Sequence, residues 1–360
     1  MRVHLVGLPH TQVTRAFPAC AFTEKVRRFA IMMKGLGHEV VLYAGEETDA
    51  PVDELVPCFS ERDRQAAVAG RHYTEASFDP ALPYWRRFNL RAAIAIRKRA
   101  GPRDFVCVIG GVAHKPIAAA LPDLVTVEFG IGYAGTFARY RVFESHAWRH
   151  VCYGAAAREP AAADGFWFDD VIPGYFEPEA FPFSAEKDDY LLFVGRLIDR
   201  KGAHIAAEIA AATGRRLVVA GHGKAPPGAE HVGVVGPEER GRLMSRARAL
   251  IAPTLYLEPF GNIVPEAHFC GTPTLTTDWG AFTETNENGV TGWRCRSLGE
   301  FVDAVDRVGD LDAAAIRARA VARYSLAAVA PLYQAYFKRL STLWGRGWYA
   351  GVPPRPARAA

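Results

Sequence analysis

Short apolar runs alternate with longer amphipathic stretches from the start of the chain. Residues 2–7 form an apolar run that predicts a strand. Residues 22–37 then repeat apolar side chains at helical spacing until Gly37 stops the pattern, and residues 39–45 form a second apolar run. This order predicts a β-α-β unit at the amino-terminal end.

The rest of the first half repeats this pattern less regularly. The runs at 105–111 and 124–130 are apolar throughout, which is typical of parallel strands covered on both faces. Residues 46–100 show little regular pattern beyond a helix near 88–99. We therefore expect a first parallel sheet with its helices on both faces.

A second series of strands and helices begins at residue 190. Strands are predicted at 190–195, 216–221, 231–236, 249–254 and 272–277, and helices at 203–213, 237–248 and directly after Gly261. The fold class expected is α/β, with two doubly wound, Rossmann-like sheets and ligands at the loops that leave the carboxyl ends of the strands. The Pro-rich segment 169–182 joins the two series.

The pattern divides the chain into four segments: a Rossmann-like domain (1–172), a second Rossmann-like domain (173–327), a C-terminal helix (328–348) and a disordered tail (349–360). Within residues 326–344, Leu332, Tyr336 and Leu340 recur at helical spacing. We interpret them as the packed face of an amphipathic helix.

Composition narrows the class of protein. The chain has 360 residues, 49% of them hydrophobic and 23% charged, which fits two globular domains. The net charge of +4 includes no run of Lys and Arg, so we expect no nucleic-acid partner. The six cysteines have no metal-ligand spacing and suggest reduced thiols in a cytoplasmic protein. No apolar run is long enough for a signal peptide or membrane span, and the oligomeric state is left open.

The first candidate site follows the run at 190–195. Arg196 and Lys201 lie on either side of a turn that leads into a helix near Gly202. A strand end, a helix amino terminus and two cations together form a good anion site, because the helix dipole and the side chains act in the same direction. A phosphate or diphosphate suits such a site. The alternative is that both cations are solvated surface residues.

The second candidate site lies in the stretch YLEPFGNIVPEAHFCGTP. Glu258 and Glu266 are separated by seven residues, Pro259 and Gly261 interrupt regular structure, and Asn262 is suited to cap a helix. Each carboxylate accepts several hydrogen bonds, which suits the vicinal hydroxyls of a sugar or ribose. The alternative is a structural interaction of a helix-start glutamate.

Taken together, FVGRLIDRKG, VVAGHG and EPFGNIVPEAHFCGTPTLTTDWGAFTE resemble the donor half of retaining glycosyltransferases of the GT-B fold, specifically glycosyltransferase family 4. That family carries G-R-x4-K-G, a G-x-G turn and E-x7-E followed by C-G-x-P in this order. The resemblance covers residues 170–295, and the first half matches only in outline. It implies two Rossmann-like domains that face a central cleft, with the last helix crossing back to the first domain.

The resemblance also implies a reaction and a set of site residues. A sugar would pass from a nucleoside-diphosphate sugar to a hydroxyl of a small-molecule or saccharide acceptor. Arg196 and Lys201 would hold the donor diphosphate, Glu266 the ribose, and Glu258 with the backbone of 260–262 the transferred sugar. The donor residues implied are Gly195, Arg196, Lys201, Gly221, Val234, Val235, Glu258, Phe260, Gly261, Asn262, Ile263 and Glu266. A UDP-sugar is the first candidate donor and a GDP-sugar the second, with the base contacted by backbone near Val234 and Val235.

No metal or cofactor is expected, because Arg196 and Lys201 would stabilise the charge that grows on the leaving diphosphate. The one D-x-D sequence, Asp310 to Asp312, precedes a late helix, and we interpret it as a solvated helix start. Retention of the anomeric configuration is implied only by the resemblance.

The acceptor side departs from the family pattern. The family often has a glycine-rich turn after its first strand and a histidine near the reacting carbon, whereas this chain has only Gly7 in the first loop and Glu128 in place of the histidine. Glu128 is therefore a fourth catalytic candidate, beside Arg196, Lys201 and Glu258, with His10 and His114 as substitutes. Further acceptor-side candidates are Tyr133, Arg139, Arg141 and Glu144.

Three other functions are weighed against this one. A nucleotide-sugar epimerase or a noncatalytic nucleotide-sugar-binding protein would share the same fold. Residues 130–135, GIGYAG, form a G-x-G-x-x-G sequence that is typical of NAD-dependent oxidoreductases. Because it follows the fourth predicted strand and leads into bulky side chains, we rank the oxidoreductase last.

Overall fold

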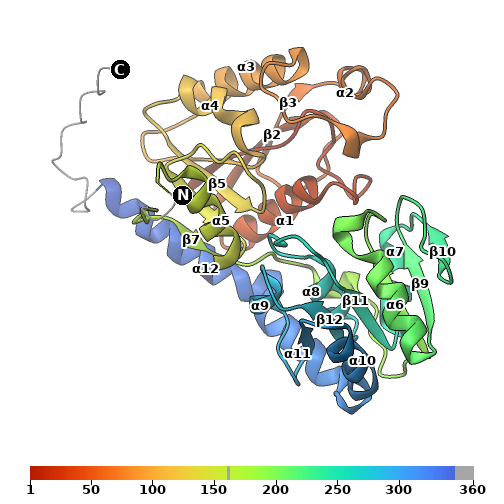
Figure 1. The fold of residues 1–360 in the computed structure, drawn as a ribbon. Helices are drawn as coiled ribbons and strands as arrows, with labels where there is room; N and C mark the ends of the chain where they lie inside the picture. Colours follow the sequence, from red (N-terminus) through yellow and green to blue (C-terminus); the bar gives the residue numbers. More distant parts are fainter. Residues whose placement is uncertain (160–162, 345–360) are drawn as a thin grey trace.

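The chain folds around two parallel β-sheets, seen as two separate lobes in Figure 1. The computed structural model describes residues 1–159 and 163–344. We call the part built on the first sheet the first domain and the part built on the second sheet the second domain. Each sheet carries helices on both faces, so an α/β class with two doubly wound sheets is confirmed.

The first sheet has the strand order β3-β2-β1-β4-β5-β6-β7 with all pairs parallel. Its strands are β1 (Arg2–Val6), β2 (Glu39–Gly45), β3 (Glu54–Phe59), β4 (Phe105–Val108), β5 (Val125–Ile131), β6 (Tyr140–Phe143) and β7 (Asp170–Val171). Its helices are α1 (Ala21–Gly35), α2 (Glu61–Val68), α3 (Pro83–Arg97), α4 (Lys115–Ala120) and α5 (His146–Ala156).

The second sheet has the order β10-β9-β8-β11-β12-β13, also parallel throughout. Its strands are β8 (Tyr190–Val194), β9 (Arg216–Ala220), β10 (Glu230–Gly233), β11 (Ala249–Ala252), β12 (Thr274–Thr277) and β13 (Gly292–Cys295). The helices are α6 (Ala203–Thr213), α7 (Pro237–Arg246), α8 (Ile263–Phe269), α9 (Phe282–Thr285), α10 (Leu298–Arg307), α11 (Ala313–Tyr324) and α12 (Leu326–Leu340).

The predicted elements of the second half are confirmed within a few residues. Gly214 ends α6 in the left-handed conformation at φ +63°, as a C-terminal glycine stop does. Asn262 stands at the start of α8, but its side chain makes no capping hydrogen bond, so its predicted capping role is wrong. Elements missed in the first half, such as β3, α2 and β6, are short and carry polar residues, so periodicity alone does not reveal them.

Helix α12 runs from the second domain back across the first (Figure 1). Its Tyr333 ring meets Phe29 of α1 at a centroid distance of 5.2 Å, and Phe337 meets Phe105 of β4 at 5.0 Å. These rings belong to the same buried cluster as the first sheet. The first domain therefore completes its hydrophobic core with a helix that follows the second domain in sequence.

The predicted packed face of this helix is only partly right. Tyr336 and Leu340 are buried, but Leu332 is 45% exposed. Steps of four residues drift around a helix of 3.6 residues per turn, so Leu332 falls outside the stripe that contacts the core. The stripe consists of Val329, Tyr333, Tyr336, Phe337 and Leu340.

The two domains are joined by chain segments that lie side by side. The Phe176 N–H donates to the Tyr324 carbonyl at 2.8 Å, and the Leu326 N–H donates to the Phe176 carbonyl at 3.0 Å. The linker and the start of α12 therefore form one hydrogen-bonded crossing. All six cysteines are free thiols, and no helix within residues 1–159 and 163–344 is both long and apolar enough to cross a membrane.

We predict that Phe337→Ala destabilises the protein by about 3–5 kcal/mol, because it leaves a cavity between α12 and the first sheet. Leu332→Ala, on the exposed side of the same helix, is the matched control and should change stability by less than about 1 kcal/mol. Equilibrium urea unfolding of both variants measures the difference. Equal destabilisation by the two changes would contradict the packing described here.

Candidate donor and acceptor cleft

Two glycines bring the ends of β8 and β9 into unusually close contact. Gly195 has φ +154° and Gly221 has φ +151°, a backbone region that side chains disfavour. A Cβ on Gly221 would lie 1.8 Å from the Gly195 carbonyl oxygen, so no larger residue fits there. This contact fixes the direction in which the loop 195–202 leaves the sheet.

The loop 195–202 brings Lys201 to Glu258. The Lys201 ammonium lies 3.0 Å from Oε2 and 3.2 Å from Oε1 of the carboxylate, and the two side chains are only 18% and 13% exposed. Gly202, at φ +77°, packs against the Pro253 carbonyl, where a Cβ would lie 2.2 Å from the oxygen. The predicted diphosphate and sugar motifs therefore meet in one contact.

Tyr256 lies beside this ion pair. Its ring centroid is 4.9 Å from the Lys201 ammonium and 4.3 Å from the Arg200 guanidinium carbon. Burial and the neighbouring Glu258 carboxylate raise the pKa of the Tyr256 hydroxyl well above its usual value. The tyrosine therefore stays neutral and gives the two cations an aromatic face.

Glu266 lines a separate part of the cleft. It lies in the first turn of α8, is 8% exposed, and its Oε2 is 3.1 Å from Nε of Arg240 on α7. The cavity in front of it measures about 360 Å³ and is bounded by Gly195, Asn262 and Ile263 of the second domain. Residues of α1 close the opposite side, so the cavity lies between the domains.

Sequence analysis did not identify the α1 residues of this cavity. Arg28 faces Glu266, and burial lowers the pKa of its guanidinium against the attraction of Glu24 and Glu266. Lys25 lies 2.6 Å from Glu144 of the loop after β6, and burial raises the pKa of that carboxyl. In the sequence, only the spacing of Lys25 and Arg28, three residues apart near the start of a helix, could have indicated that they line a cavity.

Glu128 does not reach the cleft. It is fully buried in β5, and its carboxylate accepts hydrogen bonds from the Tyr133 hydroxyl at 3.0 Å and from the N–H groups of Phe137 and Ala138 at 3.0 and 3.2 Å. Burial raises its pKa. This placement argues against the expected sugar contact, because the carboxylate is committed to holding the loop 132–138 in place.

The two candidate histidines are also enclosed. His10 is 1% exposed and packs edge-on against Phe78, and burial lowers its pKa to about 4. His114 is fully buried, bonds Asn89 through Nδ1 at 3.1 Å, and has its pKa lowered to about 3 by burial. Both rings are therefore neutral parts of the first core, which argues against their expected acceptor role.

The remaining acceptor-side candidates differ in whether they border a cavity. Arg141 is buried and bonds Asp169 through Nε and Nη2, so it supports the sheet instead of facing a ligand. Arg139 is exposed and stacks over Tyr140. Tyr133 does line a cavity between the domains.

The two valines expected near the donor base lie elsewhere. Val234 is 74% exposed after β10 and Val235 packs on the second core, and neither borders the 360 Å³ cavity.

A second cavity of about 440 Å³ lies between the domains. The first domain contributes Gly132, Tyr133, Ala134 and Trp148, and the second contributes Arg196, Arg200, Tyr256 and Leu257. Arg196 borders this second cavity, whereas the adjacent Gly195 borders the 360 Å³ cavity at Glu266. The predicted donor residues are distributed along one cleft instead of surrounding a single pocket.

The domains also touch through α9 and α5. The Glu284 carboxylate accepts hydrogen bonds from the N–H groups of His146 and Ala147 at 2.9 and 2.8 Å, and the Ser145 hydroxyl donates to the Pro259 carbonyl at 2.6 Å. A carboxylate at a helix amino terminus is favourable because it meets unpaired N–H groups and the positive end of the dipole. This contact connects the loop that carries Glu258 to the first domain.

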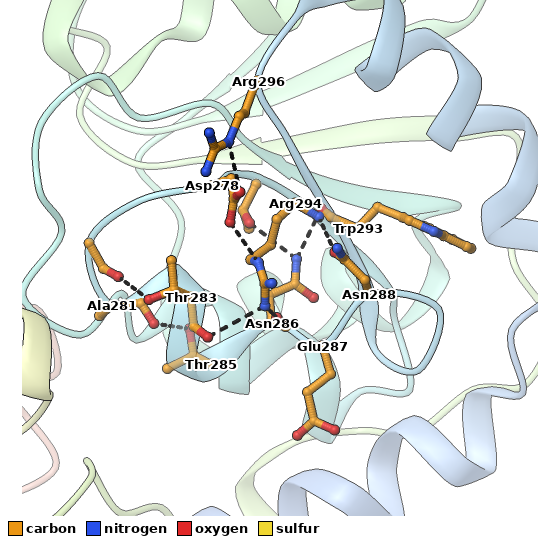
Figure 2. Close-up of polar contacts among 12 residues, drawn as sticks. Asp278, Ala281, Thr283, Thr285, Asn286, Glu287, Asn288, Trp293, Arg294 and Arg296 are labelled. Carbon is orange, nitrogen blue, oxygen red and sulfur yellow. Dashed lines mark hydrogen bonds and ion pairs between the residues drawn. The ribbon is translucent and has the colours of Figure 1, made fainter.

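A polar network holds α9 in position for this contact (Figure 2). The Asn286 amide donates to the carbonyls of Thr274 and Trp293, each at 3.1 Å. Arg294 donates to the Asn286 carbonyl at 2.8 Å and to Asp278 at 2.8 Å. In Figure 2 the Glu287 side chain points away from this network. It forms ion pairs with Arg319 and Arg323 of α11.

In the described part of the chain, no three His, Cys, Asp or Glu side chains are grouped so that they could hold a metal ion. Asp312 stands at the start of α11 and its carboxylate accepts from the Ala314 N–H at 2.9 Å. The interpretation of the D-x-D sequence as a helix start is confirmed.

Two parallel α/β sheets that face each other across a cleft, with a last helix returning to the first, define the GT-B fold. Residues 188–310 match the family Glycosyl transferases group 1. The assignment to glycosyltransferase family 4 stays a prediction.

Known proteins agree with this classification. A glycogen synthase of Mycobacterium tuberculosis is 34% identical over 182 residues, 43% of each chain, and a D-inositol 3-phosphate glycosyltransferase of Mycolicibacterium smegmatis is 30% identical over 218 residues, 54% of this chain and 49% of the relative. The match therefore spans about half or less of these relatives.

Solved structures are similar over nearly the whole chain. AviGT4, a glycosyltransferase involved in avilamycin A biosynthesis, superposes with a TM-score of 0.67 at 22% identity, covering 96% of this chain and 98% of its own. Anabaena HepE in complex with UDP and glucose gives a TM-score of 0.63 at 15% identity, covering 95% and 100%. At these identities the likeness establishes the fold alone.

We predict that Glu284→Ala shifts the domains toward a more open arrangement. Losing a carboxylate from a helix start costs about 1 kcal/mol, which corresponds to about a fivefold change in the closed-to-open ratio. Small-angle X-ray scattering should show a larger radius of gyration. Glu287→Ala is the matched control, because its partners lie within the second domain, and it should lower the melting temperature without changing that radius. An unchanged radius in Glu284→Ala would contradict a clamping role.

Proposed function

We propose that this protein is a retaining, metal-independent glycosyltransferase that moves a sugar from a nucleoside-diphosphate sugar to a hydroxyl of a small-molecule or saccharide acceptor. The observation that carries the proposal is the contact between Lys201 and Glu258, because it joins the predicted diphosphate and sugar motifs at the edge where the strands of the second sheet end. The match of residues 188–310 to Glycosyl transferases group 1 supports it.

The nucleoside end of the donor fits the 360 Å³ cavity. Glu266 offers carboxylate oxygens for ribose hydroxyls, and Arg240 lies 3.1 Å from one of these oxygens. We propose a UDP-sugar as donor, with a GDP-sugar as the next candidate. The HepE neighbour, described in complex with UDP and glucose, supports the choice of uridine.

The transfer step follows from charge. The acceptor hydroxyl oxygen attacks the anomeric carbon from the face that the diphosphate leaves, the bond from that carbon to the phosphate oxygen breaks, and the hydroxyl proton passes to the leaving phosphate oxygen. Negative charge grows on the diphosphate, and Arg196 and Lys201 stabilise it more in the transition state than in the ground state. Closure of the cleft would exclude water from the reacting carbon.

A noncatalytic nucleotide-sugar-binding protein is the second candidate function. The observation that favours it is the burial of Glu128, His10 and His114, which leaves none of these expected first-domain groups in the cleft. Such a protein would bind the donor without turnover. A nucleotide-sugar epimerase would instead release an altered sugar without any acceptor. Product analysis with the donor alone distinguishes these outcomes from a transferase, which releases only slow hydrolysis product.

A thermal-shift screen against UDP, GDP, ADP and their sugars tests donor binding. A ligand at about 100 times its Kd stabilises the folded state by about 2.7 kcal/mol. We expect Glu266→Ala to weaken UDP binding about tenfold or more, because ribose hydroxyls lose a charged acceptor. Glu239→Ala, an exposed carboxylate on α7, should leave binding unchanged. Binding of none of these nucleotides would overturn the proposed function.

We also predict that Lys201→Ala lowers kcat by about 100-fold or more while weakening the donor by less than tenfold, because its charge acts mainly on the transition state. Glu258→Gln and the double variant control for the carboxylate that Lys201→Ala leaves without its partner. Steady-state kinetics and donor titrations give the two quantities separately. An equal loss in both would contradict transition-state stabilisation.

A further inference from the structure

The 440 Å³ cavity between the domains has an unusual charge balance. Its eight lining residues include Arg196 and Arg200 and no Asp or Glu. Neither guanidinium forms an ion pair with any residue in the described ranges 1–159 and 163–344. By contrast, Lys201 is matched by Glu258 and Arg240 by Glu266. In the described part of the chain, this cavity therefore holds two arginines without an acidic partner, whereas Lys201 and Arg240 each have one.

The Arg200 side chain is exposed, and its guanidinium stacks on the Tyr256 ring. The Arg200 carbonyl accepts from the Leu255 N–H at 2.9 Å, and its guanidinium carbon lies 4.3 Å from the centroid of the Tyr256 ring. A guanidinium over an aromatic ring keeps its N–H donors available at the edge, where they bind carboxylate or phosphate in a fork. Arg200 is therefore prepared to bind an oxyanion.

The rest of the cavity suits a polyol. Trp148 donates from Nε1 to the Tyr133 carbonyl at 3.1 Å, which fixes its indole against the loop of the first domain. The Trp148 and Tyr133 rings, which both line the cavity, offer apolar surface for the C–H groups of a carbohydrate. The glycine at 132 brings backbone to the same wall, where a Cβ would lie 2.7 Å from Glu144.

We infer that this cavity binds the acceptor and that Arg200 selects an acceptor bearing an oxyanion, a phosphate or carboxylate on a sugar or polyol. The inference rests on the proposed function, which assigns the donor diphosphate to Arg196 and Lys201 and so leaves Arg200 without a donor group to bind. The nucleoside end has its own cavity at Glu266. The first-domain loop 132–134 makes the 440 Å³ cavity the side from which an acceptor hydroxyl approaches.

The test is calorimetric binding of matched compounds to the protein saturated with UDP. The probes are glucose, glucose 6-phosphate and glucuronate, with glycerol and glycerol 3-phosphate as a second scaffold. We expect at least one anionic compound to bind about ten- to a hundredfold more tightly than its neutral counterpart, as charge-assisted hydrogen bonds do. The phosphate and carboxylate arms show which oxyanion is preferred.

Arg200→Gln should abolish this preference while changing the Kd of UDP by less than twofold. Arg86→Gln, an exposed arginine on α3, removes the same charge outside the cleft and should retain the preference. The inference is overturned if no anionic compound binds better than its neutral counterpart, or if Arg200→Gln keeps the preference. If the unaltered protein did not bind UDP, this would instead contradict the proposed function.

Discussion

The site depends on a steric constraint at the ends of β8 and β9. Because Gly221 lies against the Gly195 carbonyl and Gly202 against Pro253, the loop 195–202 has one path available, and that path brings the Lys201 ammonium to Glu258. The ion pair is only partly exposed, so it is screened less by solvent than a surface pair and fixes both side chains. A backbone contact that only glycine permits thus sets the distance between two charges from separate motifs.

Contacts between residues far apart in the sequence also hold the two domains together. Helix α12 supplies Tyr333 and Phe337 to the core of the first domain, while Glu284 of the second domain meets the amino terminus of α5. The first contact is buried and apolar, so separating it would expose large rings to water. The second is polar and half-exposed, so breaking it costs little. Motion of the domains is therefore more easily accommodated at α9 and α5 than at α12.

Sequence patterns predicted the second half better than the first for a physical reason. The donor motifs are local: a strand, a glycine turn and a helix start within about ten residues place Arg196, Lys201 and Glu266. The cleft residues that were missed, Lys25 and Arg28, reach it only through the packing of α1 against the other domain. The burial of Glu128 depends on how residues 133–138 fold back over β5, which no spacing in the sequence reports.

The charged side chains of the cleft differ in whether they have a partner of opposite charge. The Glu266 carboxylate faces Arg240 and Arg28, and this arrangement is the one to which the ribose of the donor is assigned in the proposal. Lys201 and Glu258 compensate each other, and in the proposed donor complex the diphosphate would compete with the carboxylate for the ammonium. At the 440 Å³ cavity, Arg196 and Arg200 have no acidic partner in the described residues. The anionic acceptor inferred above would therefore meet Arg200 in the cavity that Trp148 and Tyr133 also border.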